Sequence, residues 1–256
     1  MTDLLSPKGR RELRKLAASR ALLAFDFDGT LAPIVRHADR AAMRPRTRAL
    51  LAEVASRFPC AVVSGRARAD LRHRLAGIPV RWLIGNHGAE GLLEPREARR
   101  MRGVVRAWRD DLQARLDPAA GVRIEDKKLS LSVHYRGVPR PAAARRTILA
   151  AVSGLPGVRV VEGKRVVNVV LASAPDKGSA LTHLVGVARP ERVLFVGDDD
   201  TDEDAFGRGL GVPVTTVRVG FRGRSRANFF LIGQDAMDRM LEILLAATAR
   251  QGGGAR

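Results

Sequence analysis

The chain has 256 residues, of which 45 are Lys or Arg and 27 are Asp or Glu, so its formal net charge is +18. With 45% hydrophobic residues, a chain of this length buries a sizeable core, which excludes disorder as its main state. The single cysteine, Cys60, excludes an internal disulfide and a cysteine-based zinc site. No apolar run reaches the ~20 residues of a membrane span, and the N-terminus lacks a signal-peptide core, so we expect a cytoplasmic protein without a membrane partner.

The positive charge suggests nucleic acid as a partner, because basic domains attract phosphate backbones. Most of the basic residues are Arg, however, and they recur along almost the whole chain instead of forming one patch. Aromatic residues make up only 4%, which leaves few platforms for stacking single-stranded bases. The composition therefore disfavours a basic nucleic-acid-binding protein, which we keep as a distant alternative.

Short apolar segments that end at polar or glycine-containing turns predict the strands of a parallel sheet. The first covers residues 21–27 and runs into Asp28-Gly29-Thr30. Two more cover residues 60–63 and 81–84, and a helix is predicted over 46–58. Strands that alternate with helices across short turns are typical of βαβ units.

A different pattern occupies the middle of the chain. Two helices are predicted there, over residues 96–117 and 140–152. Four strand-like stretches accompany them, at 122–126, 129–135, 158–162 and 165–171. The second of these stretches alternates apolar and polar residues, as a strand with one solvated face does. Together these elements predict an antiparallel domain inserted into the parallel one.

The parallel pattern resumes near Pro175. A helix is predicted over residues 177–184, strands over 192–196 and 214–219, and a closing amphipathic helix over 237–247. We therefore expect an α/β fold in which a parallel-sheet core is interrupted by an inserted α/β domain. The expected divisions are 1–95 and 174–256 for the core, and 96–173 for the insert.

Acidic side chains gather directly after two of the predicted strands. Asp26 and Asp28 lie two residues apart, so their side chains start on the same side. The second group follows the strand at 192–196 and consists of Asp198, Asp199, Asp200, Asp202, Glu203 and Asp204. If the two strands are neighbours, both groups lie at the carboxyl edge of the sheet, where open α/β folds bind ligands. Crowded carboxylates favour a bound cation such as Mg²⁺, although a lone pair like Asp26 and Asp28 also fits turn formation and helix capping.

Four segments resemble, in the same order, the four signatures of the haloacid dehalogenase superfamily of phosphotransferases. The run 25–31 (FDFDGTL) resembles the first, Ser64 the second, Lys177 the third and Gly197-Asp198-Asp199 the fourth. Alone, Ser64 fits an ordinary strand-to-helix turn and Lys177 a solvated helix start, but the ordered set favours the superfamily. The resemblance implies a Rossmannoid parallel-sheet core with a cap domain inserted between the second and third signatures.

The resemblance also implies a Mg²⁺-dependent phosphatase with defined catalytic residues. Asp26 is the expected nucleophile that forms an aspartyl phosphate. Asp28 is the expected acid for the departing alkoxide and then the base for the hydrolytic water. Ser64 and Lys177 are expected to bind the phosphoryl group.

The same resemblance implies a ligand set for the ion. Asp26, the main-chain carbonyl of Asp28 and Asp198 are the expected Mg²⁺ ligands. Asp199 and Asp202 are expected in the outer shell, where they orient metal-bound water or Lys177.

Within the superfamily, the chain is most similar to the trehalose-6-phosphate phosphatase family. The matching stretches are 26–33, 64–66, 85–90, 125–127, 134–136, 163–164, 176–178 and 197–206. The last stretch, GDDDTDEDAF, is the most family-specific of them. The similarity implies a monomer that hydrolyses trehalose 6-phosphate, a sugar phosphate, to trehalose and phosphate.

Substrate contacts are also carried over from this similarity. Glu125, Lys127 and Lys164 are the expected sugar contacts from the cap, and exposed charges on a solvated sheet are the alternative reading. His134 and Arg136 fit a structural role better. Arg66 and His87 complete the substrate-binding candidates, although His87 also fits the organisation of its own loop.

One stretch departs from the family pattern. After Gly163-Lys164 the family usually continues Val-x-Glu-Ile-(Arg/Lys)-Pro, whereas residues 166–171 read VVNVVL. Asn168 therefore replaces a Glu that contacts sugar, and Val170 replaces a basic residue. An amide still donates and accepts hydrogen bonds, so Asn168 remains a substrate-binding candidate. Another sugar phosphate is the alternative substrate, and phosphoryl transfer to an acceptor other than water is a third interpretation.

Overall fold

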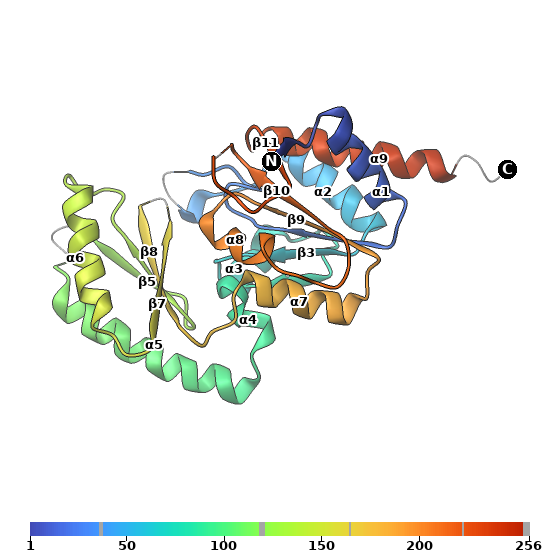
Figure 1. Cartoon of the computed structure of the whole chain (residues 1–256). Helices are drawn as coiled ribbons and strands as arrows, with labels where there is room; N and C mark the ends of the chain where they lie inside the picture. Colours follow the sequence, from blue (N-terminus) through green and yellow to red (C-terminus); the bar gives the residue numbers. More distant parts are fainter. Residues whose placement is uncertain (36–37, 118–120, 164, 222, 253–256) are drawn as a thin grey trace.

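The computed structural model describes residues 1–35, 38–117, 121–163, 165–221 and 223–252, and these form two separate sheets (Figure 1). The larger sheet is parallel, with the strand order β1-β11-β10-β9-β2-β3-β4. Its strands are β1 (Thr2–Asp3), β2 (Ala21–Phe25), β3 (Cys60–Val63), β4 (Trp82–Ile84), β9 (Arg192–Gly197), β10 (Val214–Val219) and β11 (Phe229–Leu231).

Helices cover both faces of the parallel sheet, which is why its central strands read as continuous apolar runs. One face carries α1 (Pro7–Ala17), α2 (Pro45–Arg57) and α9 (Ala236–Gly252), whose side chains pack in one apolar cluster. The other face carries α7 (Lys177–Ala188). Shorter helical segments at the strand ends are α3 (Arg68–Arg74), α4 (Ala89–Leu92), α8 (Glu203–Phe206), η1 (Ala38–Arg40), η2 (Asn86–Gly88) and η4 (Asp200–Asp202).

The register of β2 against β9 matters most for function. Phe25 pairs with Val196, and β9 continues for one more residue to Gly197, so the two strands end within one residue of the same level. The residues that follow them, Asp26 and Asp198, therefore emerge side by side at the carboxyl edge. This is the place where a parallel sheet with helices on both faces binds ligands.

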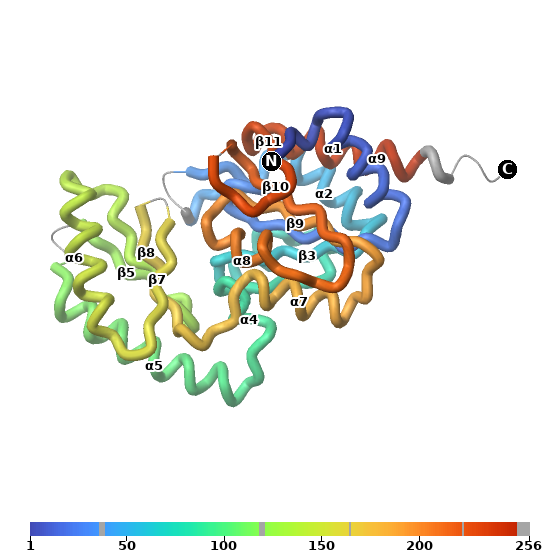
Figure 2. Tube along the Cα trace, in the orientation of Figure 1, coloured from blue at the N-terminus to red at the C-terminus, as the bar shows by residue number. Residues whose placement is uncertain are grey.

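The smaller sheet is antiparallel, with the order β5-β6-β8-β7. Its elements are β5 (Arg123–Asp126), β6 (Leu131–His134), β7 (Val158–Gly163), β8 (Val166–Leu171) and the helices α5 (Pro95–Arg115) and α6 (Pro141–Ser153). The two helices lie on one face, where Trp108, Leu112 and Ile148 pack against Leu131 and Val169. Figure 2 shows that the chain leaves the parallel sheet after α4 and returns to it at α7.

The α/β fold class, with a parallel core and an inserted antiparallel unit, is thus confirmed, and the sequence-based element bounds agree with the structure to within a few residues. The elements that went unpredicted are α1, α3, α4, α8, β1, β11 and the short helical turns η1, η2 and η4. The domain boundaries at 95/96 and 173/174 stay predictions. None of the helices in the described part of the chain is both long and apolar enough to cross a membrane.

The apolar cluster of the smaller sheet gives a stability test. Leu112 is fully buried there, so Leu112→Ala should lower the free energy of unfolding by about 3 kcal/mol. Urea denaturation followed by Trp108 fluorescence measures this, in a Trp82→Phe background because Trp82 lies on β4. The exposed Arg106→Ala should change the same free energy by less than about 0.5 kcal/mol. Equal effects of the two substitutions would contradict the packing described here.

Candidate active site

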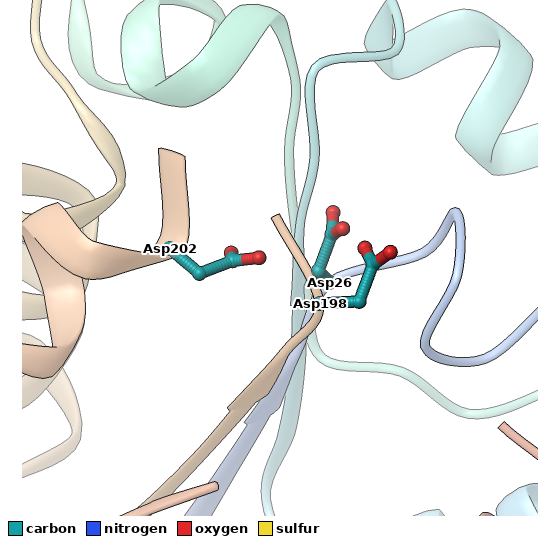
Figure 3. A group of neighbouring side chains, drawn as sticks. All are labelled: Asp26, Asp198 and Asp202. Carbon is teal, nitrogen blue, oxygen red and sulfur yellow. The ribbon is translucent and has the colours of Figure 1, made fainter. Parts of the chain in front are cut away.

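Three aspartates meet at the carboxyl edge of the parallel sheet. Asp26 follows β2, Asp198 follows β9, and Asp202 ends η4. Figure 3 shows the Asp202 carboxylate directed toward the other two from the opposite side. Each side chain is buried and offers an oxygen within 4.8 Å of an oxygen on the other two, so the cluster could hold a metal ion.

Two glycines make this close approach possible. A Cβ on Gly29 would lie 2.1 Å from Oδ2 of Asp198, and Gly29 also has a φ of +80°. A Cβ on Gly197 would lie 2.1 Å from Cγ of Asp202. Any larger residue at either position would displace one of the cluster's carboxylates.

A buried ammonium lies beside the aspartates. Lys177 is the first residue of α7, and the side chain of Asp176 caps that helix by accepting a hydrogen bond from the Ser179 amide. The Lys177 Nζ lies 2.7 Å from Oδ1 of Asp202 and 3.1 Å from Oδ1 of Asp26. Burial by itself lowers the pKa of Lys177, but these carboxylates outweigh it and raise the pKa above its usual value. Lys177 is therefore a fixed positive charge at the site.

One ammonium does not neutralise the cluster. Burial raises the pKa of Asp26 well above its ordinary value; Lys177 lowers it, and the neighbouring Asp202 and Asp198 raise it again. A divalent cation among these oxygens would reverse that shift, because it favours the ionised carboxylate. Buried, all-oxygen ligands of this kind fit a hard cation. The donor set therefore fits the metal that the sequence predicts.

Asp28 has a different environment from Asp26. Its side chain is partly exposed, and both of its oxygens accept hydrogen bonds from Arg66, at 2.6 Å each. Arg66 also donates to Asp70, which in turn accepts a hydrogen bond from Arg74. In the structure, therefore, Arg66, a predicted substrate contact, is hydrogen-bonded to Asp28, a predicted catalytic residue.

Ser64 and His87 lie at the ends of the next two strands. Ser64 is buried directly after β3, and its Oγ accepts a hydrogen bond from the Arg66 amide. His87 is buried over Gly65, where a Cβ would lie 2.4 Å from its ring. Burial lowers the pKa of His87 well below its usual value, and the charges of Lys177 and Lys127 lower it further. His87 is therefore a neutral imidazole beside the site.

The loop after β9 carries the remaining predicted acidic residues. The Asp199 side chain accepts a hydrogen bond from the Asp200 amide, and the Asp199 amide donates to Oδ2 of Asp202. Asp199 and Asp202 form a capping box that fixes the turn. Asp202 thus lies within the carboxylate cluster itself, and Asp199 forms the wall next to it. Their predicted outer-shell roles stay predictions.

A cavity of about 1010 Å³ connects this edge to the antiparallel sheet. Asp26, Asp28, Ser64, Lys177 and Asp198 line it from the parallel sheet. Residues of the antiparallel sheet line the opposite wall: Arg123, Glu125, Lys127, Ser132, His134 and Asn168. The structure therefore brings the predicted catalytic residues and the predicted sugar contacts into one space, except for Lys164, which lies outside the described residues.

The charged groups of the antiparallel wall are paired. His134 Nε2 lies 2.7 Å from Oε2 of Glu125, and this hydrogen bond, with the charge of Lys127, lowers the pKa of Glu125 to about 2. Lys127 Nζ donates to the carbonyl of Gly65, 3.1 Å away on the parallel-sheet side. Arg136 also reaches across, to the carbonyl of Val35.

A second link joins the two sheets close to Lys127. Asn86 donates to the carbonyl of Lys127 at 3.3 Å and accepts a hydrogen bond from Ser130 at 2.7 Å. With the bond from Lys127 to Gly65, it fastens the turn between β5 and β6 to the loops after β3 and β4.

Asn168 lines the cavity but is largely occupied within its own sheet. Its Oδ1 accepts a hydrogen bond from Ser132 at 2.6 Å, and its Nδ2 donates to the carbonyl of Val161 at 3.2 Å. One N–H of the amide remains for a ligand. Asn168 therefore offers less to a ligand than a carboxylate at that position would.

Sequence reasoning missed two residues of this wall, Arg123 and Ser132. Arg123 lies two residues before Glu125 on β5, so the period of two could have placed it on the same face. Ser132 gave no signal, because its role depends on Asn168 of the neighbouring strand.

The parallel sheet, its acidic edge and the inserted antiparallel unit define a haloacid dehalogenase-like fold. A solved structure described as a trehalose-6-phosphate phosphatase related protein superposes with a TM-score of 0.72 at 25% identity, covering 90% of this chain and 99% of that one. The sequence model of the trehalose-phosphatase family matches residues 24–224. The chain belongs to the trehalose-phosphatase family.

Two curated relatives show how much of the sequence is shared. A probable trehalose-phosphate phosphatase of Oryza sativa is 32% identical over 224 residues, 78% of this chain and 60% of the rice protein. A protein of Mycobacterium tuberculosis described as an uncharacterized glycosyl hydrolase is 35% identical over 239 residues, 85% of this chain but 18% of its own length. The chain thus spans less than two thirds of the length of either relative.

The close approach at Gly29 gives a test of the metal site. Gly29→Ala should weaken divalent-cation binding at least tenfold, because its Cβ displaces the Asp198 carboxylate and its φ is strained by ~1–2 kcal/mol. Calorimetric titration with Mg²⁺ measures the affinity. Gly103→Ala on α5, whose Cβ would meet nothing within 4 Å, is the matched control and should leave the affinity unchanged. Unchanged affinity in Gly29→Ala would refute this placement of the site.

Proposed function

We propose that this chain is a Mg²⁺-dependent phosphatase that hydrolyses trehalose 6-phosphate to trehalose and phosphate. The observation that carries the proposal is the single cavity in which a buried Asp26 and Lys177 face a wall of polar and charged side chains. Membership of the trehalose-phosphatase family supports the substrate. We further propose that the antiparallel unit acts as a cap over the site.

Asp26, the carbonyl of Asp28 and Asp198 would hold the Mg²⁺ ion. When bound, the ion supplies positive charge that neutralises the phosphoryl oxygens. Lys177 supplies a second, permanent charge from the protein, fixed by Asp202. Together these charges offset the repulsion between an anionic phosphate ester and an anionic nucleophile.

The reaction then proceeds in two displacements. Oδ of Asp26 attacks phosphorus, a P–O bond to Asp26 forms, and the bond from phosphorus to the sugar oxygen breaks. Asp28 in its acid form gives its proton to the departing sugar alkoxide. Asp28 next takes a proton from water, which attacks phosphorus, breaks the bond to Asp26 and releases phosphate.

Arg66 has a defined part in this sequence. In the structure Arg66 donates a hydrogen bond to each oxygen of Asp28. These bonds fix the orientation of the carboxylate, but they also leave Arg66 as its present hydrogen-bond partner. Proton donation requires Asp28 to exchange this partner for the sugar oxygen. The phosphate of the substrate offers Arg66 an alternative anion, which supports both its release from Asp28 and its expected role as a substrate contact.

Sugar recognition falls mainly to the antiparallel wall. Glu125 on β5 and Lys127 just after it carry opposite charges, and both make charge-assisted hydrogen bonds to hydroxyl groups. A lid that presents these groups also excludes water from the phosphoryl group. A different sugar phosphate remains the alternative substrate, because Asn168 replaces the usual Glu on this wall.

The decisive experiment measures phosphate release from a panel of sugar phosphates, with and without EDTA. We expect trehalose 6-phosphate to be the preferred substrate and EDTA to abolish its turnover. Asp26→Asn should reduce kcat by at least about 10⁴-fold, because the nucleophile is lost while the shape is kept. Asp235→Asn is the matched control, since Asp235 lies outside the cavity lining. Turnover that resists EDTA, or clear preference for another sugar phosphate, would overturn the mechanism or the substrate respectively.

Because Asn168 is hydrogen-bonded within its own sheet, we expect substitutions of Asn168 and of Glu125 to change KM by different amounts. Asn168→Ala should change KM for trehalose 6-phosphate by less than about threefold, because both polar atoms already have partners in the sheet. Glu125→Gln should raise KM by about tenfold or more, since hydrogen bonds to a charged group are worth about 1.5–3 kcal/mol. Steady-state kinetics measures both, with Glu162→Gln on the exposed side of β7 as the control. A KM in Asn168→Ala as high as that of Glu125→Gln would contradict this assignment.

A further inference from the structure

An arginine lies buried in the middle of the parallel sheet, where charges are rarely found. Arg218 belongs to β10, an otherwise apolar and threonine-rich strand, and its residue is 1% exposed. Removing a guanidinium from water costs several kcal/mol unless its hydrogen bonds are replaced. None of the catalytic roles assigned above uses this residue.

The partners of Arg218 all belong to the loop after β9. Nη2 donates to the carbonyl of Asp198 at 3.0 Å and to Oδ1 of Asp200 at 3.1 Å. Nη1 donates to Oε1 of Glu203 at 2.6 Å and to the carbonyl of Asp199 at 3.4 Å. Each Nη therefore binds one main-chain carbonyl and one carboxylate of the same loop.

The sheet register explains how Arg218 reaches this loop. Arg218 pairs with Gly197, the last residue of β9, so its side chain starts level with the turn that begins at Asp198. Glu203 also accepts hydrogen bonds from Ser225 Oγ and the Arg226 amide, which ties the loop to the segment after β10. The guanidinium is thus anchored to a carboxylate that is itself fixed.

The loop is held from two sides. On the cavity side, Lys177 binds Asp202, and Asp202 accepts a hydrogen bond from the Asp199 amide. On the opposite side, Arg218 binds the carbonyls of Asp198 and Asp199. The main chain at Asp198 is therefore held by both sets of hydrogen bonds, which fixes the position from which the Asp198 side chain extends.

We propose that Arg218 is a positioning residue that sets the backbone of the metal-binding loop and thereby the affinity of Asp198 for the divalent cation. The inference rests on the proposed function, because it takes Asp198 as a metal ligand. Arg218 is too deeply placed to line the cavity and acts only through the loop. Groups that orient metal ligands typically contribute about 10–100-fold to metal affinity.

Two substitutions separate positioning from simple stabilisation. Arg218→Met removes the guanidinium but keeps much of its volume, and takes one donor each from the carboxylates of Asp200 and Glu203 and from the carbonyls of Asp198 and Asp199. Arg218→Lys keeps the charge but replaces the planar fork by a single ammonium, which does not reach four acceptors at once. Arg57→Met is the matched control, because Arg57 also binds a carboxylate and main-chain and hydroxyl oxygens, away from the cavity.

The primary measurement is Mn²⁺ binding to the substrate-free protein by electron paramagnetic resonance. We expect Kd for Mn²⁺ to rise by about tenfold or more in Arg218→Met, by less in Arg218→Lys, and not at all in Arg57→Met. At saturating Mg²⁺, KM for trehalose 6-phosphate should stay within about twofold of the parent. Thermal unfolding of each variant reports any loss of stability separately.

The outcomes distinguish this inference from the proposed function. Mn²⁺ affinity within twofold of the parent in every Arg218 variant that folds, with phosphatase activity in the parent, overturns the positioning role alone. Weakened Mn²⁺ binding in the variants of a parent that hydrolyses none of the sugar phosphates supports the positioning role and overturns the proposed function. A parent that binds no Mn²⁺ overturns the inference, because there is then no ion for Arg218 to help place.

Discussion

Buried negative charge at the ends of β2 and β9 is the constraint on which the rest of this structure depends. Asp26, Asp198 and Asp202 are buried and offer oxygens within 4.8 Å of one another, an arrangement that is unfavourable without compensating positive charge. Lys177 provides one such charge and is itself held in the ionised form by the carboxylates. The features around the cluster follow from this requirement: glycines where carboxylates crowd the backbone, a capping box in the loop, and a cation site.

The positive charges close to the cluster differ in kind. Lys177 lies among the carboxylates, where it balances charge and faces the cavity. Arg66 lines the cavity and is paired with Asp28 and Asp70. Arg218 lies behind the loop and binds main-chain oxygens. The high net charge of the chain says little about these roles, because each depends on where a single cation sits relative to the acidic edge.

Periodicity was enough to predict both sheets, because their strands are apolar runs bounded by clear turns. It did not find α1, whose buried leucines Leu13 and Leu16 are spaced within a strongly basic segment, or β11, which has three residues. The positions of Asp26, Asp28, Ser64 and Asp198 could be predicted because each follows a strand of the parallel sheet, and their catalytic roles stay predictions. Their partners could not: the pairs Arg66–Asp28 and Asn168–Ser132 join segments that are distant in sequence, and Arg218 reads as part of an ordinary strand.

The strand order also has a consequence for how the molecule is assembled. β2 is made before its neighbour β9, which follows only after the entire inserted unit has been made. The antiparallel unit is contiguous in sequence and has its own apolar cluster, so it has local partners as soon as it is complete. Until β9 has been made, one side of β2 lacks its neighbouring strand, and Asp26 lacks Asp198 beside it. The three carboxylates of the buried cluster can therefore come together only after the inserted unit has been completed.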